Sequence, residues 1–328
     1  MYTKVYSNPD IYNLYIPLPE NPLKNLNCYV IKTPERSLII DTGFNRPECL
    51  AAMQEGIKEL GLKPENTDIF ITHLHSDHTG LVSLLTNDKT TVYMSAIDHE
   101  YLEASIIGNR WAEFEQYYIS EGFPESEIAA LRITNPARAF EPAGFFDAVR
   151  LNDGDKINVG GYEFTCILTP GHTPGHMCLY YEKEGLMFLG DHVLFDITPN
   201  ICWWKGFDNS LLTYLNSLKK IRSYDIKTAL PAHRTKSLDV YERIDQILDH
   251  HDARLNDTLT VIRAKEGMHA YDIAGYMKWS MRGKNWDEFP MHQKWFAVGE
   301  TIAHLDYLMD EDKIRRVERD GIKYYYPI

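Results

Sequence analysis

The sequence has no long hydrophobic run and no apolar segment at its start. Crossing a bilayer takes about 18 or more consecutive apolar residues, and the 328 residues contain no such run. Residues 1–6 also lack the apolar core of a signal peptide. A chain without a targeting segment is expected in the cytoplasm, so we expect a cytoplasmic protein with no membrane partner.

Cysteine is scarce and shows no paired spacing. An odd number of cysteines is poor evidence for a disulfide framework. Small buried hydrophobic side chains are the expected role for most of them. The five cysteines are Cys28, Cys49, Cys166, Cys178 and Cys202.

Positive charge is in short supply. The chain carries 34 lysines and arginines against 47 aspartates and glutamates, a formal net charge of −13 at pH 7. Proteins that bind nucleic acid usually present a basic face. The charge balance therefore disfavours nucleic acid as a partner and leaves room only for a local basic groove.

Histidine is concentrated in one short stretch. Residues 69–71 read as a buried strand, and His73, His75, Asp77 and His78 follow within seven residues of it. Side chains two residues apart in extended backbone leave on the same face, and a loop fixed by a sheet can aim several ligands at one point. This density of ligands is too high for a polar loop with scattered histidines, so the stretch predicts a metal site.

Further metal-ligand residue types follow other expected strands, in a fixed order along the chain. Asp41 ends the apolar stretch 38–40, His172 follows the strand expected over 162–168, Asp191 follows 186–189, and His233 follows 228–230. Together with the histidine-rich stretch these make five motifs, which resemble the signature of the metallo-β-lactamase superfamily of hydrolases over roughly residues 25–240. The match indicates a fold and a metal site, but not a substrate.

The resemblance implies an α/β fold of the αββα sandwich type, with two mixed sheets face to face and helices outside. It implies two divalent metal ions, one with three histidine ligands, the other with Asp77 and two histidines, and Asp191 bridging them. Asp41 would hydrogen-bond a ligand from beneath the metals. The implied ligands are His73, His75 and His172 for one ion, and Asp77, His78 and His233 for the other.

The expected ligands contain no thiolate. Nitrogen and carboxylate ligands suit zinc, with iron or manganese as alternatives. A hydroxide between two metals would attack the scissile group, with Asp77 as proton acceptor. The related flavin–diiron proteins have a carboxylate where this chain has His75, and carry a fused flavodoxin domain. This sequence shows no phosphate-cradling glycine loop, so redox chemistry is not expected.

Residues 99–146 interrupt the alternation of strands and helices. They hold many aromatic residues on helical stretches, including Trp111. The segment is either a packing subdomain or a cap over the metal cleft, because loops at the rim of a fixed scaffold carry specificity. Phe195 and Trp203 follow the bridging Asp191 closely and, with Trp111, are candidates for the substrate pocket.

Residues 241–328 form a second expected unit beside the catalytic domain at residues 1–240. Three helical stretches are followed by two short strands around Asp320-Gly321, a typical hairpin turn. This winged-helix-like arrangement resembles the branch of the superfamily that includes a mitochondrial endoribonuclease (the β-lactamase-like protein 2 type). Arg315, Arg316, Arg319 and Lys323 suggest phosphate contact, yet the unit holds 13 basic and 16 acidic residues, a net charge of −3.

The leading hypothesis is a dinuclear metal hydrolase acting on a small ester, thioester or lactone. The alternative enzyme is a metal-dependent single-strand endoribonuclease. A third interpretation makes the C-terminal unit a module for homodimerisation or regulation, since fold alone does not fix function.

Overall fold

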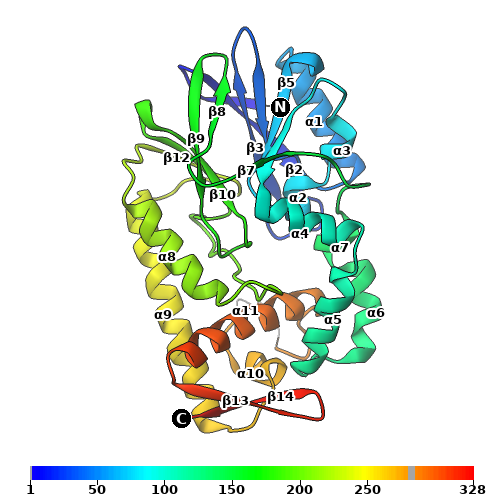
Figure 1. Ribbon diagram of the computed structural model, residues 1–328, viewed down its shortest axis with the longest axis vertical. Helices are drawn as coiled ribbons and strands as arrows, with labels where there is room; N and C mark the ends of the chain where they lie inside the picture. The colour runs from blue at the N-terminus through cyan, green and yellow to red at the C-terminus, as the bar shows by residue number, and fades with distance from the viewer. Residues whose placement is uncertain (1, 280–284) are drawn as a thin grey trace.

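The computed structural model describes residues 2–279 and 285–328 and contains two β-sheets packed face to face (Figure 1). The first sheet has seven strands in sequential order. Strands β1 to β4 pair antiparallel and β4 to β7 pair parallel. The strands are β1 (Tyr2–Tyr6), β2 (Asp10–Pro17), β3 (Asn25–Lys32), β4 (Ser37–Ile40), β5 (Thr67–Ile71), β6 (Val92–Ser95) and β7 (Val149–Leu151).

The second sheet has five strands in the order β12-β11-β10-β9-β8. Neighbouring strands are antiparallel except β11 and β12, which run parallel. The strands are β8 (Lys156–Val159), β9 (Tyr162–Leu168), β10 (Met177–Tyr181), β11 (Leu186–Gly190) and β12 (Thr228–Pro231).

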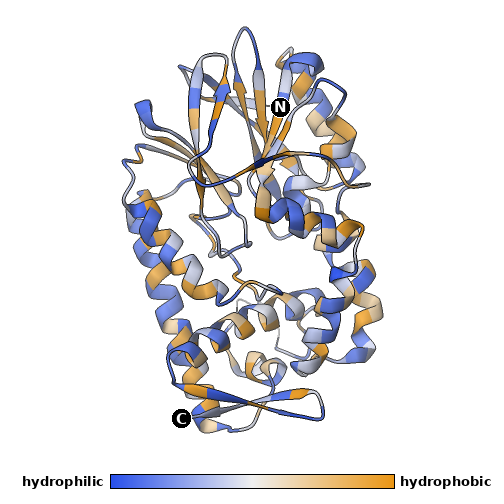
Figure 2. Ribbon diagram, in the orientation of Figure 1, coloured by the Kyte–Doolittle hydropathy of each residue, from blue (hydrophilic) through white to orange (hydrophobic). Residues whose placement is uncertain are grey.

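Both sheets are apolar on their two faces, which makes them the middle layers of a four-layer fold. Successive side chains of a strand point to opposite faces. In β10, Leu179 packs toward the first sheet with Phe70 of β5, whereas Cys178 and Tyr180 pack toward the outer helices. In Figure 2 these strands are largely hydrophobic, whereas the outer helices carry hydrophobic and hydrophilic residues side by side.

Helices cover the outer face of each sheet, as the αββα prediction requires. Helix α1 (Pro47–Glu59) buries Cys49 and Met53 against the first sheet. On the second sheet lie α8 (Ser210–Arg222) and the long α9 (Val240–Ala264). Short helices fill the connections: α2 (Ser76–Thr79), α3 (Val82–Leu85), η1 (Pro64–Asn66) and η2 (Glu182–Glu184). The predicted fold class is confirmed.

Four helices lie between β6 and β7, where the sequence indicated an inserted segment at 99–146. The first begins three residues earlier than expected, at Ala96, because Ser95 caps it by accepting a hydrogen bond from the Asp98 backbone. The helices are α4 (Ala96–Ile106), α5 (Arg110–Ser120), α6 (Glu125–Thr134) and α7 (Pro136–Ala139).

The C-terminal segment folds as helices followed by a hairpin. After α9 come α10 (Ala270–Tyr276), α11 (Met291–Asp310) and the antiparallel pair β13 (Ile314–Arg319) and β14 (Ile322–Pro327). Helices α5 and α6 pack directly on this segment: the Tyr118 and Trp295 rings stack with centroids 3.7 Å apart. One hydrophobic cluster therefore runs from the second sheet through the C-terminal helices into the inserted ones.

No helix within the described residues is both long and apolar enough to cross a membrane.

Candidate metal centre

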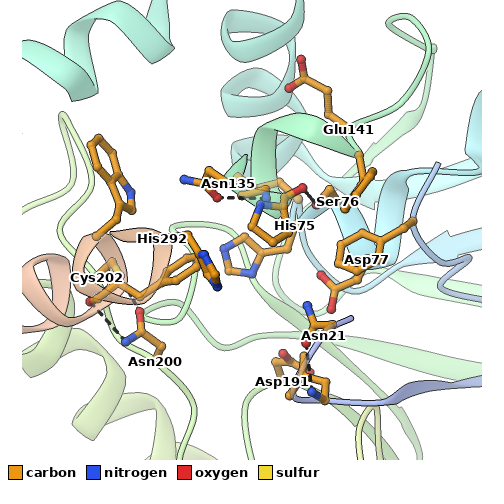
Figure 3. A pocket seen from close by; sticks show the side chains of 18 of the residues that line it. Asn21, His75, Ser76, Asp77, Asn135, Glu141, Asp191, Asn200, Cys202 and His292 are labelled. Atoms are coloured by element: carbon orange, nitrogen blue, oxygen red, sulfur yellow. Dashed lines mark hydrogen bonds between the residues drawn. The ribbon is translucent and has the colours of Figure 1, made fainter. Parts of the chain in front are cut away.

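The predicted ligands meet at one edge of the sandwich because each follows the end of a strand. The histidine-rich stretch follows β5, His172 follows β9, Asp191 follows β11 and His233 follows β12. The carboxyl ends of parallel strands such as β4, β5 and β6 lie at the same edge of a sheet. Figure 3 shows His75, Asp77 and Asp191 facing one cavity.

One group of ligand atoms comes from His73, His75 and His172, which lie close enough together to hold a metal ion. His73 Nε2 and His75 Nδ1 are 3.0 Å apart. The ring centroids of His75 and His172 are 4.7 Å apart. These are the three histidines that the resemblance assigned to one ion.

A second group is formed by Asp77, His78 and His233. His233 Nε2 lies 3.3 Å from Asp77 Oδ2 and 3.4 Å from Asp191 Oδ1. The other carboxylate oxygen of Asp191 is 3.6 Å from His172 Nε2 in the first group. Asp191 therefore lies between the two groups, where a bridging ligand belongs.

Several of these atoms are buried and have no hydrogen-bond partner within the described residues. They are His78 Nε2, His172 Nε2, His233 Nε2 and Asp191 Oδ1. Leaving a buried polar atom unpaired costs about 1–3 kcal/mol, and four such atoms pointing at one place indicate a bound group. Nitrogen and carboxylate donors suit a first-row divalent ion, so the residues fit a metal.

The three histidines of the first group have lowered pKa values, which favours metal binding. Burial lowers the pKa of His75 to about 3 and that of His172 to about 4. Burial also lowers the pKa of His73 well below its usual range. These imidazoles are therefore neutral at physiological pH, and a neutral imidazole is the form that binds a metal.

The second group is dominated by carboxylates. Burial disfavours the charged form of His78, but Asp41, Asp77 and Asp191 outweigh burial and raise the pKa of His78 to about 10. His233 behaves in the same way: burial opposes its charge, while Asp191 and Asp77 raise its pKa. Without metal, protons take the place of the cations that the carboxylates attract.

Asp41 holds His78 from the side away from the cavity. Its Oδ2 lies 2.8 Å from His78 Nδ1, and its Oδ1 accepts a 2.9 Å hydrogen bond from the Thr72 backbone. Asp41 is buried and has a φ of +62°, a left-handed conformation that Asp tolerates better than most residues. The geometry agrees with the role that the resemblance implied.

The other ligands are also held by hydrogen bonds from outside. His172 Nδ1 donates to the Asn200 carbonyl at 2.8 Å, and His233 Nδ1 donates to the Asn25 carbonyl at 2.9 Å. His176 Nε2 accepts from the Asp191 backbone at 3.1 Å. His176 thus holds the backbone of the predicted ligand Asp191 in place. These bonds direct each Nε2 of the two ligating histidines toward the cavity.

Asp98 of α4 ties two ligand loops together, a role that the sequence did not reveal. Its carboxylate accepts from the Leu74 backbone at 2.9 Å, the Gly175 backbone at 2.6 Å and the Thr173 hydroxyl at 2.6 Å. Burial raises the pKa of Asp98 to about 7, although these hydrogen bonds oppose the rise. A Cβ at Gly175 would collide with Ser95 and Asp98, so this close approach requires glycine.

A cavity of about 730 Å³ opens in front of the ligand groups. Trp111 and Trp203, two of the candidates for the substrate pocket, line this cavity. Phe195 does not: its side chain is 3% exposed and packs in the core, while its neighbour Leu194 lines the cavity. Adjacent residues face opposite ways, so a position close to Asp191 in the sequence was not enough to place Phe195.

The C-terminal helix α11 contributes a wall that sequence reasoning missed. His292, Gln293, Trp295 and Phe296 from its first two turns line the cavity. Figure 3 shows His292 beside Asn200 and Cys202, facing the cavity that also contains His75 and Asp77. The C-terminal segment was expected as a unit of its own, and no local pattern indicated that α11 reaches the site.

Family models match most of the chain. Residues 22–233 match the metallo-beta-lactamase superfamily model, which covers more than half of the sequence. The chain belongs to the metallo-β-lactamase superfamily. Residues 286–328 match a second model, the metallo-beta-lactamase-like C-terminal domain. The second match confirms that the chain has the C-terminal module predicted from the resemblance.

Two relatives that match this superfamily member are distant from it in sequence. It is 25% identical to probable metallo-hydrolase YqjP from Bacillus subtilis, over 93% of this chain and 94% of that protein. It is 26% identical to atrochrysone carboxyl ACP thioesterase from Aspergillus fumigatus over 69% of this chain. The matched segments span 59% of the length of lactamase-like protein adaB from Aspergillus niger and 42% of the length of the thioesterase.

A solved structure has the same fold over nearly the whole chain. A metallo-beta-lactamase family protein from Thermus thermophilus superposes with a TM-score of 0.79 at 26% identity, covering 98% of this chain and 100% of that one. The relatives of this superfamily member thus include proteins named as a probable metallo-hydrolase and as a thioesterase.

Proposed function

We propose that the protein is a dinuclear metal-dependent hydrolase that cleaves an ester, thioester or lactone with a bulky apolar acyl group. The observation that carries this proposal is the position of two ligand groups, with Asp191 between them, in the wall of the cavity. A hydrolase of this type needs its metals and its acyl pocket to share one space.

The walls of the cavity favour an apolar acyl group. Phe114 and Trp111 come from the inserted helices, Trp203 and Trp204 from the loop after β11, and Phe296 from α11. Among the described residues that line the cavity, Arg46 is the one lysine or arginine, and Glu48 already pairs with it at 3.0 Å. The cavity therefore offers little to an anionic acyl group and a large apolar area to a neutral one.

The residues of the chain have distinct roles in this reaction. Divalent ions, zinc in the first instance and iron or manganese as alternatives, would polarise the carbonyl and activate a water. Asp77 is 8% exposed and lines the cavity, so its carboxylate can take the proton of that water. Trp204 fixes the His172 loop by donating to its carbonyl at 3.3 Å, and stacks near His75. The aromatic walls hold the acyl group and exclude bulk water.

A thioester substrate has independent support. A relative that matches 69% of this chain is named an ACP thioesterase. The inserted segment, residues 99–146, holds eight acidic and three basic residues, so the rim does not suit an acidic carrier protein. We therefore favour a small thioester or ester over a carrier-bound substrate.

Single-stranded RNA is the second candidate, because aromatic walls can also stack bases. The three arginines of the C-terminal hairpin, Arg315, Arg316 and Arg319, are exposed. Lys323 is not available to phosphate: its side chain is buried and its Nζ lies 3.1 Å from Glu121 Oε1. This removes one of the four basic residues that suggested nucleic-acid contact.

A substrate panel tests the proposal. The purified protein, loaded with zinc or manganese, is assayed with acetyl and aromatic acyl thioesters, a lactone, a phosphodiester and a short RNA. We expect the aromatic thioester to be cleaved fastest. Phe296→Ala should lower kcat/KM for it about 10-fold or more, while the exposed control Tyr276→Ala should not. Cleavage of RNA alone would overturn the proposal in favour of the ribonuclease.

A further inference from the structure

The segment that follows Asp191 contains a hydrogen-bond acceptor for the predicted metal ligand His172. The Asn200 carbonyl accepts the hydrogen bond from His172 Nδ1 at 2.8 Å. This bond fixes the tautomer of His172, so that Nε2 is left without a proton and faces the cavity. The position of the Asn200 backbone therefore decides where the His172 ligand atom lies.

Helix α11 holds this segment in place through the Asn200 side chain. Asn200 Nδ2 donates to Glu300 Oε2 at 2.8 Å, and Cys202 Sγ donates to Asn200 Oδ1 at 2.5 Å. The Trp203 backbone donates to the Gly299 carbonyl at 3.3 Å. A Cβ at Gly299 would collide with Tyr118 and Cys202, so this glycine allows the segment to lie against the helix.

The Glu300 side chain is buried and contacts protein groups instead of solvent. It is 7% exposed, and Arg254 of α9 is its neighbour, with Arg254 Nε 3.7 Å from Glu300 Oε1. One oxygen of Glu300 thus faces Arg254 and the other accepts from Asn200. A buried carboxylate whose two oxygens contact two different elements holds those elements in a fixed relative position.

We propose that Glu300 is a positioning residue for the metal ligand His172, acting through Asn200. The inference rests on the metal centre of the proposed function, and it assigns the C-terminal helix a part in building that centre. Glu300 lies 128 residues after His172 in the sequence, in the region of a different family model. The C-terminal module is therefore a structural part of the metal centre as well as a wall of the cavity.

Metal affinity of the full-length protein tests this inference without any substrate. The metal-free protein is titrated with cobalt(II) in competition with a chelator, and the cobalt absorption bands are recorded. Glu300→Ala removes the acceptor, Glu300→Gln keeps an oxygen that can accept from Asn200, and Asn200→Ala removes the donor while keeping the backbone carbonyl. Glu311→Gln, an exposed glutamate just after α11, is the control.

We expect Glu300→Ala and Asn200→Ala each to weaken cobalt binding at the His73–His75–His172 group about 10–100-fold and to change the absorption bands. The double variant should lose little more than either single one, because both break the same link. Glu300→Gln and Glu311→Gln should stay close to the wild type, which a general loss of packing would not explain.

Unchanged cobalt affinity and bands in Asn200→Ala and Glu300→Ala would overturn the inference. If Glu300→Ala does not fold, the comparison of Asn200→Ala with Glu300→Gln tests the inference. The inference is contradicted if both variants lose cobalt affinity equally, or if neither loses any. A wild-type protein that binds no metal would refute the proposed function as well. Wild-type binding with unaffected variants refutes only the role of Glu300.

Discussion

At the residue scale, the candidate metal centre depends on groups that hold the ligand residues by hydrogen bonds from outside. Asp41 holds His78, Asn200 holds His172 and His176 holds Asp191. Such supports set the orientation and the protonation of a ligand, and their loss is felt at the metal. These hydrogen bonds fix the orientation of the ligand side chains, so that their metal-binding atoms point to one place.

Asp41→Asn should weaken metal binding while leaving the fold intact. Asparagine has the same shape and tolerates the same left-handed backbone conformation, but its neutral amide accepts the His78 Nδ1 proton more weakly than a carboxylate does, which makes His78 Nε2 a poorer metal ligand. We expect a loss of about 10–100-fold in metal affinity, measured by chelator competition. Asp312→Asn is the matched control, because Asp312 also has a positive φ, at +52°, but is exposed. Equal affinities in Asp41→Asn and the wild type would show that Asp41 does not support the site.

Metal binding should release a proton from His78 in the second ligand group. The pKa of His78 is raised to about 10, so His78 is protonated near pH 7 in the metal-free protein. Since His78 must lose this proton to bind a metal, affinity should rise with pH over pH 6–8, about tenfold per unit for the proton released. Calorimetry in buffers of different ionisation enthalpy counts the protons released. Binding that is independent of pH and buffer would contradict the charge state assigned to His78.

At the scale of elements, the inserted helices and the C-terminal segment act as one layer. The Tyr325 hydroxyl donates to Glu121 at 2.9 Å, and Lys323 Nζ lies over the Tyr117 ring. Tyr117 in turn stacks on Trp203, with centroids 3.5 Å apart, and Trp203 lines the cavity. The hairpin therefore supports the cavity wall through a chain of direct contacts.

Glu121→Ala should destabilise the whole protein. It would leave the buried Lys323 without its partner, and removing one member of a buried ion pair costs about 3–5 kcal/mol. Urea unfolding of the metal-free protein measures this change, with Glu125→Ala, an exposed residue at the start of α6, as control. A loss no larger than that of the control would show that this contact does not bind the two segments together.

Most of these elements could be predicted from short patterns in the sequence. The contacts between distant segments could not. The loop from His73 to His78 could be assigned because its ligands are contiguous and follow an apolar strand. The hairpin at Asp320 could be assigned from its turn residues. The contact from Glu300 to Asn200 joins segments a hundred residues apart, and neither segment carries a pattern that points to the other.

At the scale of the whole molecule, the metal centre lies between two parts of the chain that are far apart in the sequence. The sandwich supplies the ligands at its edge, and the inserted and C-terminal helices supply much of the facing wall (Figure 1). The fold followed from five ordered motifs, and the predicted ligands lie together because strand ends fix where they converge. The wall of the cavity could not be predicted in this way. A continuous hydrophobic cluster joins the inserted helices to the C-terminal helices, which the sequence indicated as two separate units.

The central claim is that the two ligand groups hold two metal ions that perform hydrolysis. Elemental analysis of the purified protein, before and after reconstitution, tests it most directly, with Asp191→Ala and His233→Ala as variants and His250→Ala of α9 as control. The account predicts about two metals per chain in the wild type and the control, with less metal and no acyl hydrolysis in both variants. Fewer than about one metal per reconstituted chain, or full hydrolysis by the Asp191→Ala protein, would contradict it.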